Sequence, residues 1–167
     1  MKNFYLTTPI YYVNDKPHIG HAYTSLAADT LARFKKLDNY KVFFATGTDE
    51  HGQKVEQSAK EKNISVESFT DEISLKFKNM SSLLNLTNND FIRTTENRHK
   101  EQVQKVWKKL LCKDQIYLGS YKGWYSVRDE TFISEADIKT DGNNNKIGPS
   151  KALLKWVEEH SYFFRLT

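Results

Sequence analysis

The chain has 167 residues, of which 38% are hydrophobic and 13% aromatic, enough for one domain or for one domain with a small insertion. Its formal net charge of +4 is mildly basic, which fits contact with nucleic acid without establishing it. The single cysteine, Cys112, excludes an internal disulfide framework, and we expect it to be a small core residue. The sequence has no run of transmembrane length and no signal-peptide pattern, so we expect a cytoplasmic protein without membrane contact.

The N-terminal segment predicts a strand, a turn and a helix. Residues 4–8 are aromatic and β-branched, which indicates a buried strand that ends at Pro9. A turn follows at residues 14–17, and no Gly or Pro interrupts the stretch from His21 to Asp38. We therefore expect a helix with one buried apolar face, made of Ile19, Tyr23, Leu26, Thr30, Phe34 and Leu37.

The helix opens with His18-Ile19-Gly20-His21, a tetrapeptide suited to binding a nucleotide triphosphate. A helix N-terminus offers unpaired N–H groups and a positive dipole end to an anion. Gly20 would let a flat base approach the backbone, and both histidines can donate hydrogen bonds to phosphate oxygens. On these four residues alone, ordinary capping and surface histidines are the favoured interpretation.

A second strand, residues 39–45, runs into the polar segment Thr46-Gly47-Thr48-Asp49-Glu50-His51-Gly52. In open α/β sheets, polar residues at the carboxyl ends of parallel strands line the ligand crevice. Asp49 is therefore a candidate binding residue, although an Asp flanked by glycines also suits a turn or a helix cap. Glu50 and His51 could cap the next helix or line the site, and we assign them no role.

The remaining elements alternate between helix and strand up to residue 112. Helices are expected from residue 53 to about Lys62, after a Ser65 cap, and from Asn97 to Cys112, with a strand at residues 91–93. This alternation predicts an α/β protein with a parallel sheet. From Ile116 onward short aromatic β runs appear at residues 116–118, 123–126, 155–157 and 162–164, with a turn at 141–145.

These segments together resemble the methionyl-tRNA synthetase family. The resemblance lies in residues 7–14, in the His-Ile-Gly-His signature of class I synthetases, and in residues 46–52, which narrow it to the methionine enzyme. Residues 90–96 and 161–166 are also similar to that family. The resemblance implies a Rossmann-like catalytic domain with an inserted connective domain. It also implies activation of L-methionine by ATP, with Mg²⁺, to methionyl-adenylate, followed by transfer to tRNA(Met).

The resemblance also implies roles for individual residues. Ile10 and Tyr12 would lie at the methionine side chain, where an aliphatic and an aromatic group suit a thioether. Asp49 would bind the substrate ammonium. ATP would be bound by His18, Gly20, His21 and, less specifically, Asn14, with the two histidines as the catalytic residues. Core packing of Tyr12 is compatible with its substrate role.

The sequence departs from the family in two respects. Ser126-Val127-Arg128-Asp129 stands where many members have a Cys-x-x-Cys zinc pair, so we expect no structural zinc. The family's lysine-rich triphosphate loop and its anticodon-binding domain are missing. We therefore expect residues 1–115 to be the first half of the catalytic domain and residues 116–167 the start of the connective insertion, inactive alone. The alternatives are a fragment of a leucyl, isoleucyl, valyl or cysteinyl enzyme, or a non-catalytic nucleotide-binding module.

Overall fold

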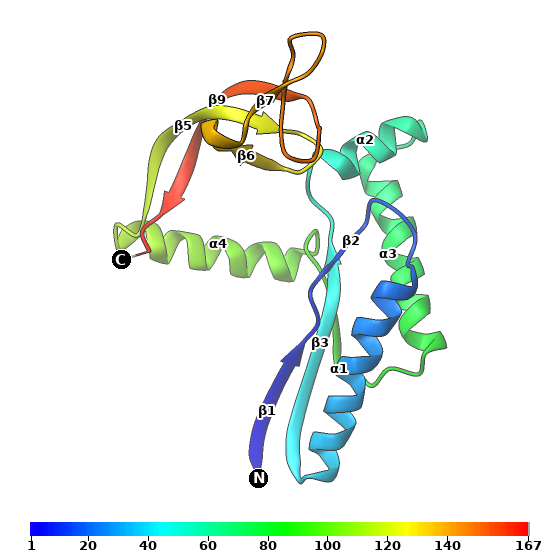
Figure 1. Cartoon of the computed structure of the whole chain (residues 1–167). Coiled ribbons are helices and arrows are strands. Elements are labelled where there is room, and N and C mark those ends of the chain that lie inside the picture. Colours follow the sequence, from blue (N-terminus) through cyan, green and yellow to red (C-terminus); the bar gives the residue numbers. More distant parts are fainter. Residues whose placement is uncertain (167) are drawn as a thin grey trace. The chain divides into compact units, whose positions relative to one another are not determined.

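The computed structural model describes residues 1–166, which form two compact units (Figure 1). Unit 1 comprises Met1–Gln104, and unit 2 begins at Lys105. The division falls within helix α4, Asn97–Cys112, whose bounds are those the sequence predicts. Among the described residues, no helix combines the length and the apolar character that a membrane span requires.

The centre of unit 1 is a four-stranded parallel sheet, and this confirms the predicted α/β class. Strand β3, Tyr40–Asp49, pairs with β1, Lys2–Thr7, with the two-residue β2, Tyr11–Tyr12, and with β4, Asp90–Arg93. Ala45 pairs with both Thr7 and Asp90, so β4 lies on the opposite side of β3 from β1. The carboxyl half of β3 is accordingly buried, whereas its amino half alternates between exposed and partly buried residues.

Three helices connect these strands: α1, Ile19–Leu37, α2, Gln53–Glu61, and α3, Val66–Leu83. The core of unit 1 lies where α2 and α3 meet β2. It consists of Tyr11, Val13, Val55, Ala59, Phe69, Ile73 and Phe77, with Met80 and Phe91 packed against it. Helix α2 thus buries Val55 and Ala59, and α3 buries the apolar residues Phe69, Ile73 and Phe77. Ser65 caps α3 as predicted, because its side chain accepts a hydrogen bond from Ser68 N at 3.1 Å.

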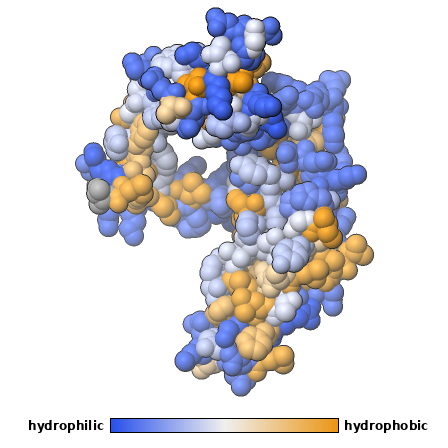
Figure 2. Space-filling model, viewed as in Figure 1, coloured by the Kyte–Doolittle hydropathy of each residue, from blue (hydrophilic) through white to orange (hydrophobic). Residues whose placement is uncertain are grey.

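The predicted buried face of α1 is wrong. Ile19, Tyr23 and Leu37 are 85%, 76% and 84% exposed, and the rest of that stripe is exposed too. The helix instead buries Ser25, Asp29 and Ala32. Polar groups on this face have partners within unit 1, and they orient the helix differently from the direction that apolar periodicity suggests. Figure 2 shows apolar surface over the part of the molecule where α1 and β3 lie in Figure 1.

Unit 2 contains an antiparallel sheet with the order β6–β5–β9. The four predicted aromatic runs lie on only two long strands, β5, Ile116–Ser126, and β9, Leu154–Phe164, which pair along their whole length. Strand β6 is Thr131–Ile133, and a short 3₁₀ helix spans Glu135–Asp137. Strands β7, Lys139–Thr140, and β8, Lys146–Ile147, form a hairpin around the predicted turn. Cys112 is exposed, so its prediction as a core residue is wrong, since the last turn of α4 leaves it uncovered.

Candidate functional site

The His-Ile-Gly-His signature forms a helix cap made of two histidines. His18 is the N-cap residue of α1, and its Nδ1 accepts a hydrogen bond from Gly20 N at 3.0 Å. His21 Nδ1 accepts one from His18 N at 3.1 Å, which completes a reciprocal capping box. The two rings lie 3.8 Å apart between centroids. The ordinary capping role and the proposed nucleotide role therefore apply to the same two side chains.

The cap determines which ring nitrogens remain available to a ligand. Because Nδ1 of each ring accepts a hydrogen bond, the neutral rings carry their proton on Nε2. Partial burial, and to a lesser degree the nearby His18, lower the pKa of His21 below its usual range. A neutral His21 preserves the cap and presents an Nε2–H donor, the chemistry that a phosphate oxygen requires.

Gly20 is needed for a reason that the sequence did not reveal. A Cβ built at this position would lie 2.9 Å from Cε1 and 3.1 Å from Nδ1 of His18. Both atoms belong to the ring that caps the helix, so a side chain here would push His18 out of its hydrogen bond with Gly20 N. The small residue therefore maintains the histidine cap.

Tyr11 connects the signature to the core. Its ring stacks on Phe77 with centroids 5.1 Å apart and contacts the edge of the His21 ring at 5.2 Å. Its hydroxyl forms a 2.6 Å hydrogen bond with Ser25 of α1. Tyr11 is thus the core residue of β2, whereas Tyr12 is 50% exposed. The interpretation of Tyr12 as a core residue is wrong. Side chains alternate along a strand, and Tyr11 takes the inward position.

The expected methionine-binding residues lie around the carboxyl end of β3. Tyr12 is the register partner of Asp49, so strand pairing places these two residues side by side. Asp49 is partly buried and accepts a long hydrogen bond from His51 N at 3.5 Å. Ile10, just before β2, is 47% exposed, and Asn14 is exposed in the turn that follows β2. Tyr12 and Ile10 are therefore accessible to a ligand.

Gly47 permits close contact between β3 and β4 immediately before this site. A Cβ at Gly47 would lie 2.0 Å from the carbonyl oxygen of Ile92, far inside van der Waals contact. Any larger residue would therefore separate the two strands. This close approach brings the segment after β4 beside the end of β3.

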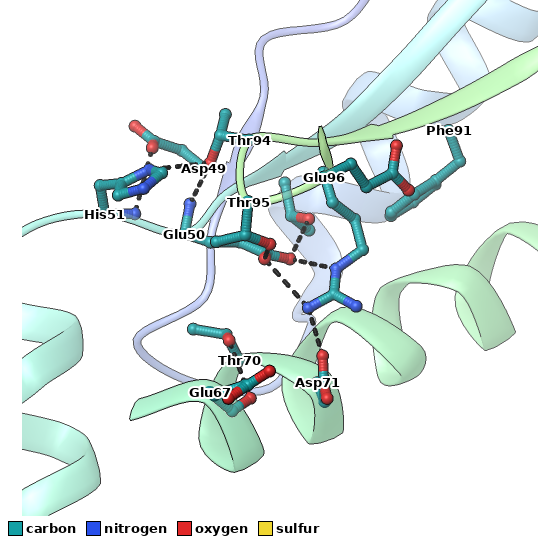
Figure 3. A network of polar contacts seen from close by, with 12 residues as sticks. Asp49, Glu50, His51, Glu67, Thr70, Asp71, Phe91, Thr94, Thr95 and Glu96 are labelled. Atoms are coloured by element: carbon teal, nitrogen blue, oxygen red, sulfur yellow. Dashed lines mark hydrogen bonds and ion pairs between the residues drawn. The ribbon is translucent and has the colours of Figure 1, made fainter. Parts of the chain in front are cut away.

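A network that the sequence analysis missed occupies this junction (Figure 3). The Glu50 side chain is fully buried and accepts hydrogen bonds from Arg93 Nε at 2.7 Å and Arg93 Nη2 at 3.0 Å. Thr48 Oγ1 donates to it at 2.8 Å, and Thr95 Oγ1 donates a further hydrogen bond. Arg93 also reaches Asp71 of α3 at 2.5 Å. The one signal in the sequence is a pair of opposite charges, Glu50 just after β3 and Arg93 at the end of β4, but it does not specify that these two strands pair.

The suggestion that Glu50 or His51 caps the next helix is not borne out. The N-cap of α2 is Gly52, which has a φ of 124°, and no side chain donates or accepts a capping hydrogen bond there. Glu50 is directed to Arg93 instead, and His51 Nδ1 lies 3.2 Å from Thr94 Oγ1. Both residues bond to the segment that follows β4.

In unit 2, the positions expected to replace a zinc pair are linked by hydrogen bonds. Ser126 Oγ donates to Asp129 Oδ2 at 2.7 Å and accepts from Asp129 N at 3.2 Å. Ser150 Oγ also donates to Asp129 Oδ2. Within residues 1–166, no group of three His, Cys, Asp or Glu side chains is arranged to hold a metal ion.

Comparison with known proteins shows which family the chain matches. A family model described as class I tRNA synthetases (M) matches residues 4–152. The chain is 55% identical to methionine–tRNA ligase of Rickettsia felis and 56% identical to that of Rickettsia prowazekii, covering 100% and 99% of this chain. It covers 32% of either relative, so it spans about a third of their length.

A solved structure gives the same picture at lower identity. Mycobacterium tuberculosis methionyl-tRNA synthetase, in complex with methionyl-adenylate, is 42% identical and superimposes with a TM-score of 0.89. The match covers 99% of this chain and 33% of that chain.

Proposed function

The chain belongs to the class I tRNA synthetases of the methionine type, and on that premise we propose that it forms part of a methionine–tRNA ligase active site. The reaction would activate L-methionine with ATP to methionyl-adenylate and then transfer the aminoacyl group to tRNA(Met). The observation that carries the proposal is the superposition of this chain on a relative in complex with methionyl-adenylate. Such a protein would act in the cytoplasm, where translation consumes charged tRNA.

In this proposal the histidine cap binds ATP. The start of α1 combines the positive end of the helix dipole with the Nε2–H donors of His18 and His21, a suitable set for phosphate oxygens. Donors fixed before the reaction stabilise charge that builds up during adenylyl transfer. Asn14, exposed in the preceding turn, would contribute to the same nucleotide site.

The end of β3 binds the amino acid in the same proposal. The partly buried Asp49 carboxylate would pair with the substrate ammonium. Tyr12, its register partner, and Ile10 would contact the thioether side chain. The proposal further assigns residues 1–115 to the first half of the catalytic domain and residues 116–167 to the start of the connective insertion.

We test this assignment by substituting Asp49 in the gene product as its source organism makes it. Asp49→Ala should lower kcat/KM for methionine-dependent pyrophosphate exchange by roughly a hundredfold, from loss of a charge-assisted contact. Asp38→Ala, which removes an exposed carboxylate at the other end of α1, is the control and should match the parent. Exchange supported by leucine, isoleucine, valine or cysteine instead of methionine would favour another class I enzyme. Nucleotide binding without any exchange would favour a non-catalytic module.

The proposal includes an insertion without structural zinc. Support comes from the hydrogen bonds that join Ser126, Asp129 and Ser150, since a hydroxyl already paired with a carboxylate is a poor zinc ligand. Elemental analysis of tag-free protein should find far less than one zinc per chain. A stoichiometric metal that resists chelators would contradict this part of the proposal.

A further inference from the structure

The Glu50–Arg93 pair lies directly beside the proposed ammonium-binding residue. Glu50 follows Asp49 in the chain, and its carboxylate receives hydrogen bonds from three side chains, those of Arg93, Thr48 and Thr95. Figure 3 shows Asp49 and His51 on one side of this segment. The Glu50 carboxylate is hydrogen-bonded to Arg93 instead. The two adjacent carboxylates therefore have different surroundings. Glu50 lies in a buried hydrogen-bond network, whereas Asp49 is partly exposed.

Glu50 is held in its ionised form. Burial alone would raise the pKa of its carboxyl group, but the hydrogen bonds from Arg93, Thr95 and Thr48 outweigh burial and lower the pKa. The same pairing raises the pKa of Arg93. A buried, bidentate ion pair of this kind contributes little net stability compared with apolar packing, but it fixes geometry closely.

The backbone held by this pair is the part of the site where strand pairing stops. The β3 ladder ends at Asp49, whose partner is Tyr12. Beyond it, Glu50 N donates to Thr94 Oγ1 at 2.9 Å, and Thr94 N donates to Thr48 O at 3.3 Å. Asp49 thus lies between the paired part of β3 on one side and the hydrogen-bonded Glu50 on the other.

We propose that Glu50 is a positioning residue, which fixes the end of β3 through Arg93 so that the Asp49 carboxylate faces the ammonium group of an amino-acid substrate. The inference rests on the proposed role of Asp49. A rival interpretation is that the pair only ties β4 to α3 through Asp71. Asp71 lies on α3, its side chain is 58% exposed and it accepts a hydrogen bond from Arg93 Nη2, so it offers a matched comparison.

The decisive experiment is a double-mutant cycle between Glu50→Gln and Asp49→Ala in the complete gene product, followed by pyrophosphate exchange. Misplacement of a binding group by about 1 Å can cost up to about a hundredfold, so Glu50→Gln should raise KM for methionine by roughly ten- to hundredfold. KM for ATP should change by less than about twofold, because the nucleotide donors lie at the start of α1. In the Asp49→Ala background, Glu50→Gln should have no further effect on KM for methionine.

Each other outcome has a defined meaning. Additive effects of the two substitutions, or equal changes in KM for ATP and methionine, would overturn the positioning role. So would an Asp71→Asn variant that matched Glu50→Gln, since we expect Asp71→Asn to change KM for methionine by less than twofold. If Glu50→Gln cannot be recovered folded, Thr95→Val takes its place in the cycle. It removes one donor, keeps the ion pair, and should give a smaller change in the same direction.

The cycle separates this inference from the proposed function. A parent protein without methionine-dependent exchange would contradict the function itself. An active parent in which Asp49→Ala is severe and Glu50→Gln is additive with it would contradict only the role of Glu50.

Discussion

Helices α1 and α3 contact the same core but differ in what they bury. Helix α3 buries three large apolar side chains, Phe69, Ile73 and Phe77. Helix α1 has a comparable apolar stripe, yet it buries Ser25, Asp29 and Ala32 and leaves residues such as Phe34 exposed. Polar contacts orient α1 against the sheet, and apolar contacts orient α3. The comparison shows that the face a helix buries depends on which polar or apolar groups of the fold lie against it.

The largest test of this difference removes one phenylalanine from each helix. Phe77 is fully buried against Tyr11 and His21, whereas Phe34 is 57% exposed. Phe77→Ala should lower the free energy of unfolding by about 3–5 kcal/mol, because it removes apolar contacts and leaves a cavity. Phe34→Ala should change it by less than about 1 kcal/mol. Chemical denaturation followed by circular dichroism measures both, and equal losses would contradict the assignment of faces.

A second test concerns the polar face of α1. Asp29 accepts hydrogen bonds from Thr87 N at 2.6 Å and Thr87 Oγ1 at 2.7 Å, and from Arg33 Nε at 2.6 Å. Asp29→Asn should reduce the free energy of unfolding by about 2 kcal/mol, since charged hydrogen bonds are lost at a buried site. Asp38→Asn removes an exposed partner of Lys35 and should cost less than about 1 kcal/mol.

Asp29 also makes the free energy of unfolding depend on pH. Burial raises the pKa of Asp29, but hydrogen bonds from Arg33 and Thr87 outweigh it and lower the pKa below 3.8. The contribution of ionised Asp29 to the free energy of unfolding is therefore present above about pH 4 and is lost as the pH falls through the folded-state pKa. The difference in stability between parent and Asp29→Asn should shrink over that acid range. A constant difference down to the lowest pH would indicate that Asp29 is not ionised in the folded protein.

Local patterns in the sequence predicted the elements well. The 3.6-residue period placed α4 within its observed bounds, and the Ser65 signal placed the start of α3. These features depend on residues a few positions apart, and local hydrogen bonds and packing decide them. The same holds for the signature, whose histidines form the cap of their own helix.

Contacts between distant segments were not predictable in this way. Glu50 and Arg93 are 43 residues apart in the chain and meet because β3 and β4 pair in one particular register. No local pattern specifies the pairing of two such parallel strands. The exposed stripe of α1 was misassigned for a related reason. Periodicity identifies an apolar face, but whether that face is covered depends on which other groups in the fold reach it.

Substitutions in the exposed apolar stripe of α1 should have the smallest effect on stability. They should, however, clearly reduce self-association. Phe34 and Leu37 are 57% and 84% exposed, and contiguous apolar surface favours self-association and dye binding. Phe34→Lys with Leu37→Lys should change the free energy of unfolding by less than about 1 kcal/mol, because neither side chain packs in the core and cations suit a helix C-terminus. Binding of a hydrophobic dye, and the aggregated fraction in analytical ultracentrifugation, should both fall severalfold. Leu83→Lys, an 86% exposed position at the end of α3, is the matched control and should leave both readouts close to the parent. If the control reduced association as strongly as the double variant, general surface charge would be the cause, and the stripe of α1 would have no special part in it.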